Sequence, residues 1–185
     1  MKNTITAFFI LITLLSSGSA FSTQLSVDMV AGGEVDSSLV LSSGSTFDIN
    51  VLVDEAVDFA GFEFGLGFDS AFLTATSITS GDIFGLDTFL VDDTISEGSV
   101  LFSEITWADV GLDINSSTVL ATISFAVKSE GASDVLLTNI LLSDSLGFDI
   151  SPVTVANGAV SAVPAPAAFW LFFSGLVGVI SLRKK

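Results

Sequence analysis

The run Asp58-Phe-Ala-Gly-Phe-Glu-Phe-Gly-Leu-Gly-Phe-Asp-Ser-Ala-Phe-Leu73 decides the fold of this chain. Its large apolar residues fall at every second position: Phe62, Phe64, Leu66 and Phe68. Small or acidic residues stand between them, namely Glu63, Gly65, Gly67 and Asp69. This alternation is typical of a β-strand with one buried face. The phenylalanines carry a large apolar area, so we expect this strand near the middle of the core, with its glycine face nearly bare.

Shorter alternating runs on both sides of this stretch predict about nine strands joined by turns, and no long helical period separates them. The clearest runs cover 25–29, 39–41, 47–53, 74–79, 100–107, 119–127, 135–142 and 153–160, with a looser run at 87–91. We expect an acidic turn over 92–98 and a loop over 108–116. Short strands with turns every 8–12 residues are typical of a two-sheet sandwich. Ile123 and Phe125 join the central residues in the predicted core.

The composition supports one β domain and removes much catalytic chemistry. The chain has 185 residues, half of them apolar and 17 of them Phe, which is enough for one sizeable core. It contains neither Cys nor Tyr, and it also lacks His, the commonest general base and metal ligand. A hydrolase is therefore disfavoured.

The charge is strongly acidic and unevenly spread. All 21 acids lie between Asp28 and Asp149, whereas four of the five basic residues lie near the two ends. Between the ends, Lys128 alone opposes the 21 acids, which gives a net charge of −20. Such a surface repels nucleic acid and anionic lipid, so we expect no nucleic-acid partner. It suits basic proteins, cations or neutral sugars, or it is simply a solvated surface.

The first twenty residues read as a secretory signal peptide. Met1–Thr4 is a basic start, residues 5–15 are apolar, and small residues lead to a cleavage site after Ala20. Eleven apolar residues are too few to span a bilayer comfortably. We therefore expect cleavage by signal peptidase, and export in a Gram-negative bacterium.

The domain resembles the cohesin family over roughly residues 24–160. The resemblance lies in Leu25-Ser-Val-Asp28, Gly44–Val53 and Phe59–Asp69, and again in Thr118–Val127, Leu141–Asp144 and Val153–Gly158. It implies a nine-stranded jelly-roll sandwich related to carbohydrate-binding modules. It also implies a non-catalytic module that binds dockerins and helps to assemble polysaccharide-degrading complexes. This chain holds one such domain and no dockerin of its own, so its ligand need not be a dockerin.

Residues 163–185 resemble a PEP-CTERM sorting signal, with a Pro-x-Pro motif, an apolar helix and a basic end. The residues that carry the resemblance are Val163, Pro164, Pro166, Trp170, Arg183, Lys184 and Lys185. Ala165 replaces the Glu of the family name. The apolar run 167–182 would be about 24 Å long as a helix, somewhat short of a hydrocarbon core of ~30 Å. The resemblance implies transient inner-membrane anchoring, processing by an exosortase and display at the cell surface or in the extracellular matrix. A plain single-pass anchor is the alternative.

Few residues are candidates for chemistry. Glu63 and Glu104 would be the carboxylates of a glycosidase pair, but alternation places Glu63 on an outer face and no other residue marks a cleft. Asp92, Asp93 and Glu97 form either a calcium site or, as we expect, a hydrated acidic turn. Trp107 either stacks on a sugar ring as a ligand contact or belongs to the core.

A second calcium-like spacing, at Asp113, Asn115 and Ser117, lacks the Gly and the bidentate Glu of a calcium loop. We therefore predict no catalytic, cofactor or metal residues. The expected function is a surface-displayed binding module for a protein or polysaccharide. A matrix component without a discrete ligand is the alternative, and a secreted hydrolase is disfavoured.

Overall fold

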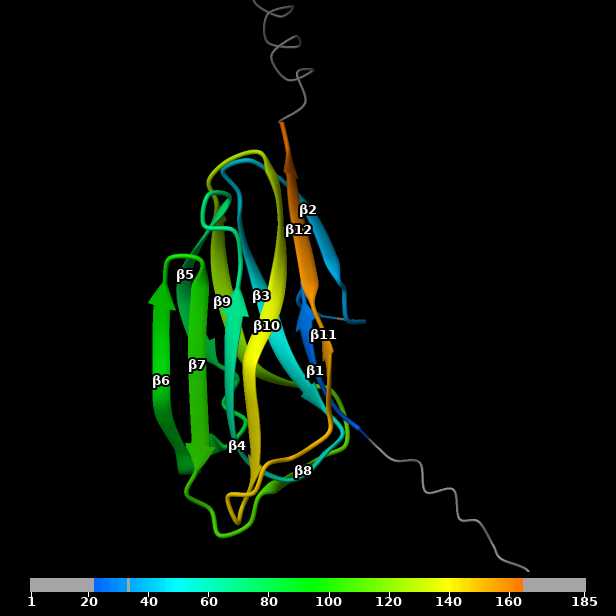
Figure 1. The fold of residues 1–185 in the computed structure, drawn as a ribbon, viewed down its shortest axis with the longest axis vertical. Coiled ribbons are helices and arrows are strands. Elements are labelled where there is room, and N and C mark those ends of the chain that lie inside the picture. Colours follow the sequence, from blue (N-terminus) through cyan, green and yellow to red (C-terminus); the bar gives the residue numbers. More distant parts are fainter. Residues whose placement is uncertain (1–21, 33, 165–185) are drawn as a thin grey trace, which may run out of the picture.

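The computed structural model describes residues 22–32 and 34–164, which form a β-sandwich (Figure 1). The strands are β1 (Thr23–Asp28), β2 (Ser38–Ser42), β3 (Thr46–Asp54), β4 (Ala56–Gly67), β5 (Leu73–Ser80), β6 (Thr88–Ser96), β7 (Ser99–Thr106), β8 (Leu112–Ile114), β9 (Thr118–Val127), β10 (Gly131–Asp144), β11 (Val153–Ala156) and β12 (Gly158–Val163). One 3-10 turn, Gly85–Asp87, precedes β6. The expected signal and tail helices fall outside the described residues. Within those residues, no helix is long and apolar enough to cross a membrane.

The strands form two sheets that face each other. The smaller sheet has the order β11-β1-β3-β9-β5, and the larger has the order β2-β12-β10-β4-β7-β6, with β8 paired to β4. The described chain enters at the start of β1 and leaves at the opposite end of the sandwich, beyond β12 (Figure 1). The all-β sandwich is confirmed, but residues 22–32 and 34–164 form twelve strands rather than about nine.

The stretch quoted first forms β4, which lies between β10 and β7 in the larger sheet. Phe62, Phe64 and Leu66 are at most 3% exposed, as the alternation predicted. Phe62 stacks on Phe59 and Phe64, with ring centroids 6.0 and 6.1 Å apart, and Phe84 and Phe102 complete the cluster. This aromatic cluster is the centre of the core.

Phe68 departs from the prediction because β4 ends at Gly67. Its ring is only partly buried, and it packs edge-on against Phe125 with the centroids 5.1 Å apart. Phe125 and Ile123, both on β9 of the smaller sheet, are fully buried as expected. Phe47 stacks on Phe125 from the neighbouring β3. A second aromatic cluster therefore forms at the end of the core where β4 stops.

The prediction of an acidic turn at 92–98 is wrong. β6 continues through Asp92 and Asp93 to Ser96, and the turn is confined to Glu97 and Gly98. β6 is an edge strand, so its acidic side chains reach water without leaving the sheet. Charges on an edge strand, and the bulge between Leu90 and Asp92, hinder pairing with another sheet.

Two other boundaries differ from the prediction. The loop predicted over 108–116 contains the three-residue strand β8, which pairs with the start of β4. The run 153–160 divides into β11, which pairs with β1, and β12, which pairs with β10. The chain changes sheet at Asn157 and Gly158. A Cβ on Gly158 would lie only 3.0 Å from Cγ of Met29, so the crossing needs a glycine.

Candidate functional site

The larger sheet has an outer face that is built from β6, β7, β4 and β10. Residues paired across antiparallel strands lie on the same face, so the strand register defines this surface. The outer face consists of Phe89, Asp92, Thr94 and Ser96 on β6, Ser99, Leu101, Ser103 and Ile105 on β7, Gly61, Glu63, Gly65 and Gly67 on β4, and Leu136, Thr138, Leu141 and Ser143 on β10. Its residues alternate with the inward ones that form the core.

This outer face mixes exposed apolar and acidic side chains. Leu136 and Leu141 on β10 are 43% and 54% exposed. Glu63 lies beside Leu141 on one side and Ser103 on the other, so a carboxylate stands in the middle of the face. This face carries no basic side chain. The only basic residue between Ser22 and Pro164 is Lys128, which lies just beyond the end of β9. Its ammonium group donates a hydrogen bond to the carbonyl of Ser70. This face therefore combines exposed apolar side chains with acidic ones.

The glycines of β4 are less bare than the alternation predicted. Gly61 and Gly65 are buried, and an added Cβ at Gly65 would lie 2.6 Å from Oγ1 of Thr138. At Gly61 the same atom would lie 2.7 Å from Oγ of Ser143. Only Gly67 is open, with the nearest atom 3.9 Å away. Side chains from the neighbouring strands therefore lie over β4 and make the face flatter.

Two aromatic side chains lie side by side at one end of the outer face. The rings of Phe89 and Trp107 have centroids 5.1 Å apart and planes tilted by 58°. Phe89 is 45% exposed and Trp107 66% exposed, so Trp107 is not a core residue. The backbone N–H of Trp107 donates to the carbonyl of Asp87 over 2.9 Å, which holds the residue beside β6. The two rings therefore form an exposed aromatic surface at this end of the face.

Glu63 and Glu104 do not form a catalytic pair. Glu63 pairs with Ser103 and faces outward, whereas Glu104 pairs with Phe62 and faces the core, where it is 2% exposed. Oε2 of Glu104 accepts a hydrogen bond of 3.0 Å from the hydroxyl of Ser80. Burial raises the pKa of Glu104 and outweighs the opposing effect of that hydrogen bond. The two carboxyls lie on opposite sides of the sheet and cannot act on one substrate.

The candidate calcium residues are also dispersed. Asp92 and Asp93 are successive residues of β6 and point to opposite faces, and Oδ1 of Asp92 accepts from the N–H of Thr94. In the second candidate spacing, Asp113 lies in β8, and Asn115 and Ser117 lie between β8 and β9. Among residues 22–32 and 34–164, no three acidic side chains are close enough to hold a metal ion.

Of the other site residues predicted from the sequence, only Val163 and Pro164 are described. Both are exposed where β12 ends. Ala20, Pro166, Trp170 and the basic residues 183–185 lie outside the described residues. The sequence analysis missed Phe89, whose partner at position 107 becomes visible only when β6 and β7 are paired. It also missed Asp58, whose carboxylate joins the start of β4 to the loops that hold Gly111 and Ser145.

The fold defines a class of protein: an all-β sandwich whose larger sheet carries an acidic, partly apolar outer face. A family model described as "Cohesin domain" matches residues 33–162. The chain belongs to the cohesin domain family. No curated protein sequence matches it.

Solved structures with the same fold are distant in sequence. A non-cellulosomal cohesin from the archaeon Archaeoglobus fulgidus is 16% identical, with a TM-score of 0.60 over 80% of this chain and 96% of that one. The sixth cohesin of scaffoldin B from Acetivibrio cellulolyticus, solved with a mutant dockerin, is 20% identical, with a TM-score of 0.60 over 77% and 99%. The OlpA cohesin of Clostridium thermocellum, also solved as a cohesin–dockerin complex, is 15% identical, with a TM-score of 0.60 over 77% and 99%.

Proposed function

We propose that this protein is a non-catalytic binding module that holds a dockerin-like protein against the outer face of its larger sheet. The observation that carries the proposal is the composition of that face. Exposed leucines on β10 lie beside the central carboxylate of Glu63, and the aromatic pair Phe89 and Trp107 lies at one end. Membership of the cohesin family supports the same kind of partner, because members solved as complexes carry a dockerin.

The chemistry available to the described residues supports recognition rather than bond cleavage. The sequence has no His or Cys, and the two glutamates considered as an acid–base pair face opposite sides of the larger sheet. Fold alone supplies no catalytic activity. Binding to a flat face requires none of these groups.

We place this binding outside the cytoplasm, on the basis of the two sequence ends. The leader ending at Ala20 would direct export, and the tail from Val163 to Lys185 would anchor the chain in the inner membrane until an exosortase processes it. The domain would then act at the cell surface or in the extracellular matrix. The basic end Arg183-Lys-Lys185 fits a cytoplasmic position before processing.

The second candidate ligand is a neutral polysaccharide, which the exposed pair Phe89 and Trp107 favours. Aromatic faces offer apolar area with a fixed geometry, and a neutral chain is not repelled by the acidic surface. Such binding would depend on these two rings and little on Leu136, Leu141 or Glu63. The two candidate ligands therefore depend on different residues of the same face.

The test measures binding of the full chain to two probes: recombinant dockerins from the solved complexes and an array of neutral glycans. We expect Leu141→Arg and Glu63→Lys to reduce dockerin binding at least tenfold. Thr79→Arg is the matched control, because Thr79 is exposed on β5 in the smaller sheet and should leave binding unchanged.

The outcomes separate the candidates. Glycan binding that is lost in Trp107→Ala but kept in Leu141→Arg would replace the protein partner with a polysaccharide. Binding to neither probe, or equal losses in the Thr79→Arg control, would contradict the proposal. If the protein bound neither probe, a matrix component without a discrete ligand would be the better description.

A further inference from the structure

Within residues 22–32 and 34–164, β5 is the longest sheet edge without a charged side chain. The two sheets end in four edge strands, which are β11 and β5 in the smaller sheet and β2 and β6 in the larger one. β6 carries two aspartates, and β11 and β2 have only four and five residues. The eight residues of β5 read Leu73-Thr-Ala-Thr-Ser-Ile-Thr-Ser80. Charges, prolines and short length commonly protect an edge against pairing with another chain. β5 has none of these three features.

Two residues of β5 direct their backbone groups away from β9. The N–H of Lys128 donates across the start of the β5–β9 ladder, and the N–H of Gly81 donates across its end. Bonded and non-bonded pairs alternate between antiparallel strands. Continued from both ends of the ladder to its bulge, this alternation makes Ala75 and Ile78 non-bonded residues. Their N–H and C=O groups therefore face the open side of β5, where no strand of the described chain pairs with them.

A hollow of about 290 Å³ lies beside this open edge, between β5 and the end of β6. We call it the edge hollow. Leu73 and Ala75 line it from β5, Ile95 lines it from β6, and Phe68 adds an aromatic ring. Ala75 and Ile95 pair with buried residues of β9 and β7, so both point between the sheets. β5 and β6 lie on the same side of the sandwich (Figure 1). A strand added to β5 would direct every second side chain toward this hollow.

The charges around the edge hollow favour a basic segment. Glu97 lines the hollow, and Asp93 lies two residues before Ile95 on the same face of β6, where it is exposed. Lys128 also lines the hollow, but its ammonium group donates to the carbonyl of Ser70 over 2.8 Å. Residues two apart on a strand are separated by about 7 Å. A basic side chain two residues from an apolar one would therefore face Asp93 when the apolar one enters the hollow.

We propose that β5 binds an extended segment of a partner protein as an additional strand. An apolar side chain of the segment fills the edge hollow, and a basic side chain two residues away faces Asp93. Main-chain hydrogen bonds to Ala75 and Ile78 supply affinity, and the hollow selects the side chain, which is how strand addition achieves specificity. An extended chain satisfies such a row of backbone groups along its whole length.

A second copy of this protein is a poor occupant of the same edge. Each domain carries 21 acids against one base, so two domains would repel each other. The proposed strand addition is also independent of the dockerin-like partner. Ala75 and Ile78 belong to the smaller sheet, and Ile95 points away from the outer face of the larger one.

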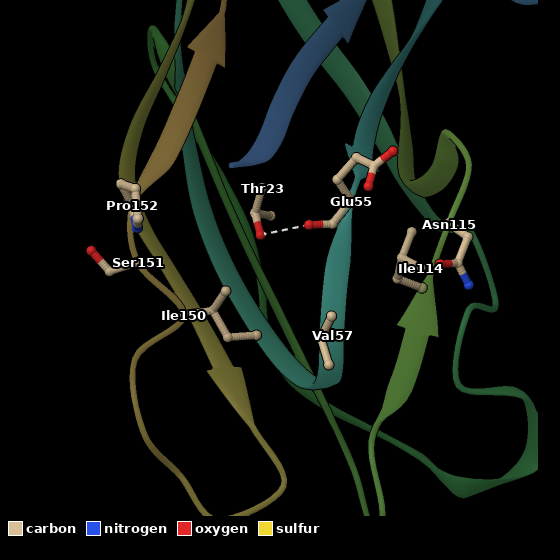
Figure 2. Close-up of a pocket in the computed structure, with 8 residues that line it drawn as sticks. All are labelled: Thr23, Glu55, Val57, Ile114, Asn115, Ile150, Ser151 and Pro152. Carbon is tan, nitrogen blue, oxygen red and sulfur yellow. Dashed lines mark hydrogen bonds between the residues drawn. The ribbon is translucent and has the colours of Figure 1, made fainter. Parts of the chain in front are cut away.

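A second hollow, of about 440 Å³, provides a control position (Figure 2). Its lining also combines apolar side chains, namely Val57, Ile114 and Ile150, with one carboxylate, that of Glu55. Figure 2 shows that these residues come from strand ends and from the segment that precedes β11. The second hollow therefore has similar side chains but does not extend along an edge strand. Val57 is 74% exposed, so a substitution there disturbs little packing.

The test uses the full chain and a synthetic peptide, Thr-Lys-Thr-Phe-Thr-Lys-Thr, blocked at both ends. Its Phe can enter the edge hollow while one Lys faces Asp93, whichever direction the peptide runs. We expect hydrogen exchange of the Ala75 and Ile78 amides to slow about tenfold or more in the complex, because both N–H groups become bonded. The same peptide with N-methyl groups on alternate residues should bind more weakly, because one of its edges can no longer donate hydrogen bonds.

Ile95→Lys should weaken peptide binding about tenfold, because it removes apolar lining and places a like charge beside the peptide's lysines. Val57→Lys is the matched control, since it makes the same change in charge at the second hollow, and it should leave binding unchanged. Unchanged exchange of the two amides at the highest soluble peptide concentration would overturn the proposal. Equal losses in Ile95→Lys and Val57→Lys would do the same. Protection of these amides that rises with protein concentration, without peptide, would replace the partner segment with a second copy.

Discussion

The hydroxyl of Ser145 donates a hydrogen bond of 2.7 Å to Oδ2 of Asp58, although 87 residues separate them. Oδ1 of the same carboxylate accepts from the N–H of Gly111 over 2.7 Å. Asp58 has a φ of +53°, a conformation that Asp and Asn adopt more readily than most residues. This one side chain therefore connects the start of β4 with the loops before β8 and after β10.

Asp58→Asn should weaken this connection, because an amide nitrogen cannot accept the hydrogen bonds that a carboxylate accepts. The hydrogen bond from Ser145, followed by that from Gly111, lowers the pKa of Asp58 below 3.8. The ionised Asp58 carboxylate therefore stabilises the folded state at pH values above its ordinary pKa of 3.8. This contribution to stability is lost as the pH falls from 3.8 through the lowered pKa of the folded state. We expect a lower melting temperature for Asp58→Asn at pH 7, measured by calorimetry, and convergence with the unchanged protein in strong acid.

Asp109→Asn is the control for this prediction. Asp109 is an exposed acid in the same loop and accepts no hydrogen bond among the described side chains. Equal effects of the two substitutions at pH 7 would mean that the Asp58 connection contributes nothing specific. Ser145→Ala should reproduce part of the Asp58→Asn loss.

Glu104→Gln should have the opposite effect and raise the melting temperature at pH 7. Burial raises the pKa of Glu104 above its ordinary value of 4.5, so the folded state favours the protonated form. Stability therefore decreases as the pH rises from the ordinary value through the raised one. The gain from Glu104→Gln should shrink as the pH falls below about 4.5, where the natural side chain is already neutral. An equal gain from Glu63→Gln on the outer face would refute this explanation.

Strand alternation in the sequence correctly predicted which side chains of the long strands are buried. Phe62, Phe64 and Leu66 alternate with small residues, and burial follows that period in β4. The same rule located β3, β7 and β9, because one face of each is packed against the opposite sheet. It also placed Glu63 on the outer face, which disfavoured a glycosidase pair with Glu104.

Features that depend on pairing could not be read from alternation. Asp92 and Asp93 resemble a turn, but the edge position of β6 lets them stay in a strand. β8 has only three residues, too few to show a period, and it exists because β4 offers it a partner. Likewise, Phe89 and Trp107 meet only through the β6–β7 register, and Asp58 meets Ser145 only through the loops.

Gly65→Ala should destabilise the protein by about 1–3 kcal/mol in urea unfolding, as overpacking does. The new Cβ would lie 2.6 Å from Oγ1 and 3.3 Å from the carbonyl oxygen of Thr138. Gly67→Ala is the matched control two residues away on the same face, where the nearest atom is 3.9 Å distant. It should be neutral or slightly stabilising, because Ala loses less backbone freedom than Gly on folding. A similar loss at both positions would show that the neighbouring strands do not lie over β4.

Phe64→Ala should cost about 3–5 kcal/mol, as large aromatic truncations in cores do. The Phe64 ring is fully buried and contacts Phe62 and Phe102, with ring centroids 6.1 and 6.0 Å apart. Phe89→Ala removes a ring that is 45% exposed and should cost less than about 1 kcal/mol. Denaturant midpoints of the two variants measure the difference. If Phe89→Ala cost as much as Phe64→Ala, the core would not be centred on β4.

The response of binding to salt distinguishes a charged partner from a neutral one. The domain carries one base against 21 acids, and Glu63 lies in the middle of the outer face. A dockerin-like partner that presents basic groups to this face should bind more weakly as salt rises, since exposed charges are screened beyond ~10 Å at 0.1 M. Equilibrium binding of the full chain to the dockerin probe, titrated from low to high salt, measures this effect. Glu63→Gln should reduce the slope, and Trp107→Ala should lower affinity while leaving the slope unchanged. Salt-independent binding that Trp107→Ala abolishes would instead identify a neutral partner stacked on the aromatic pair.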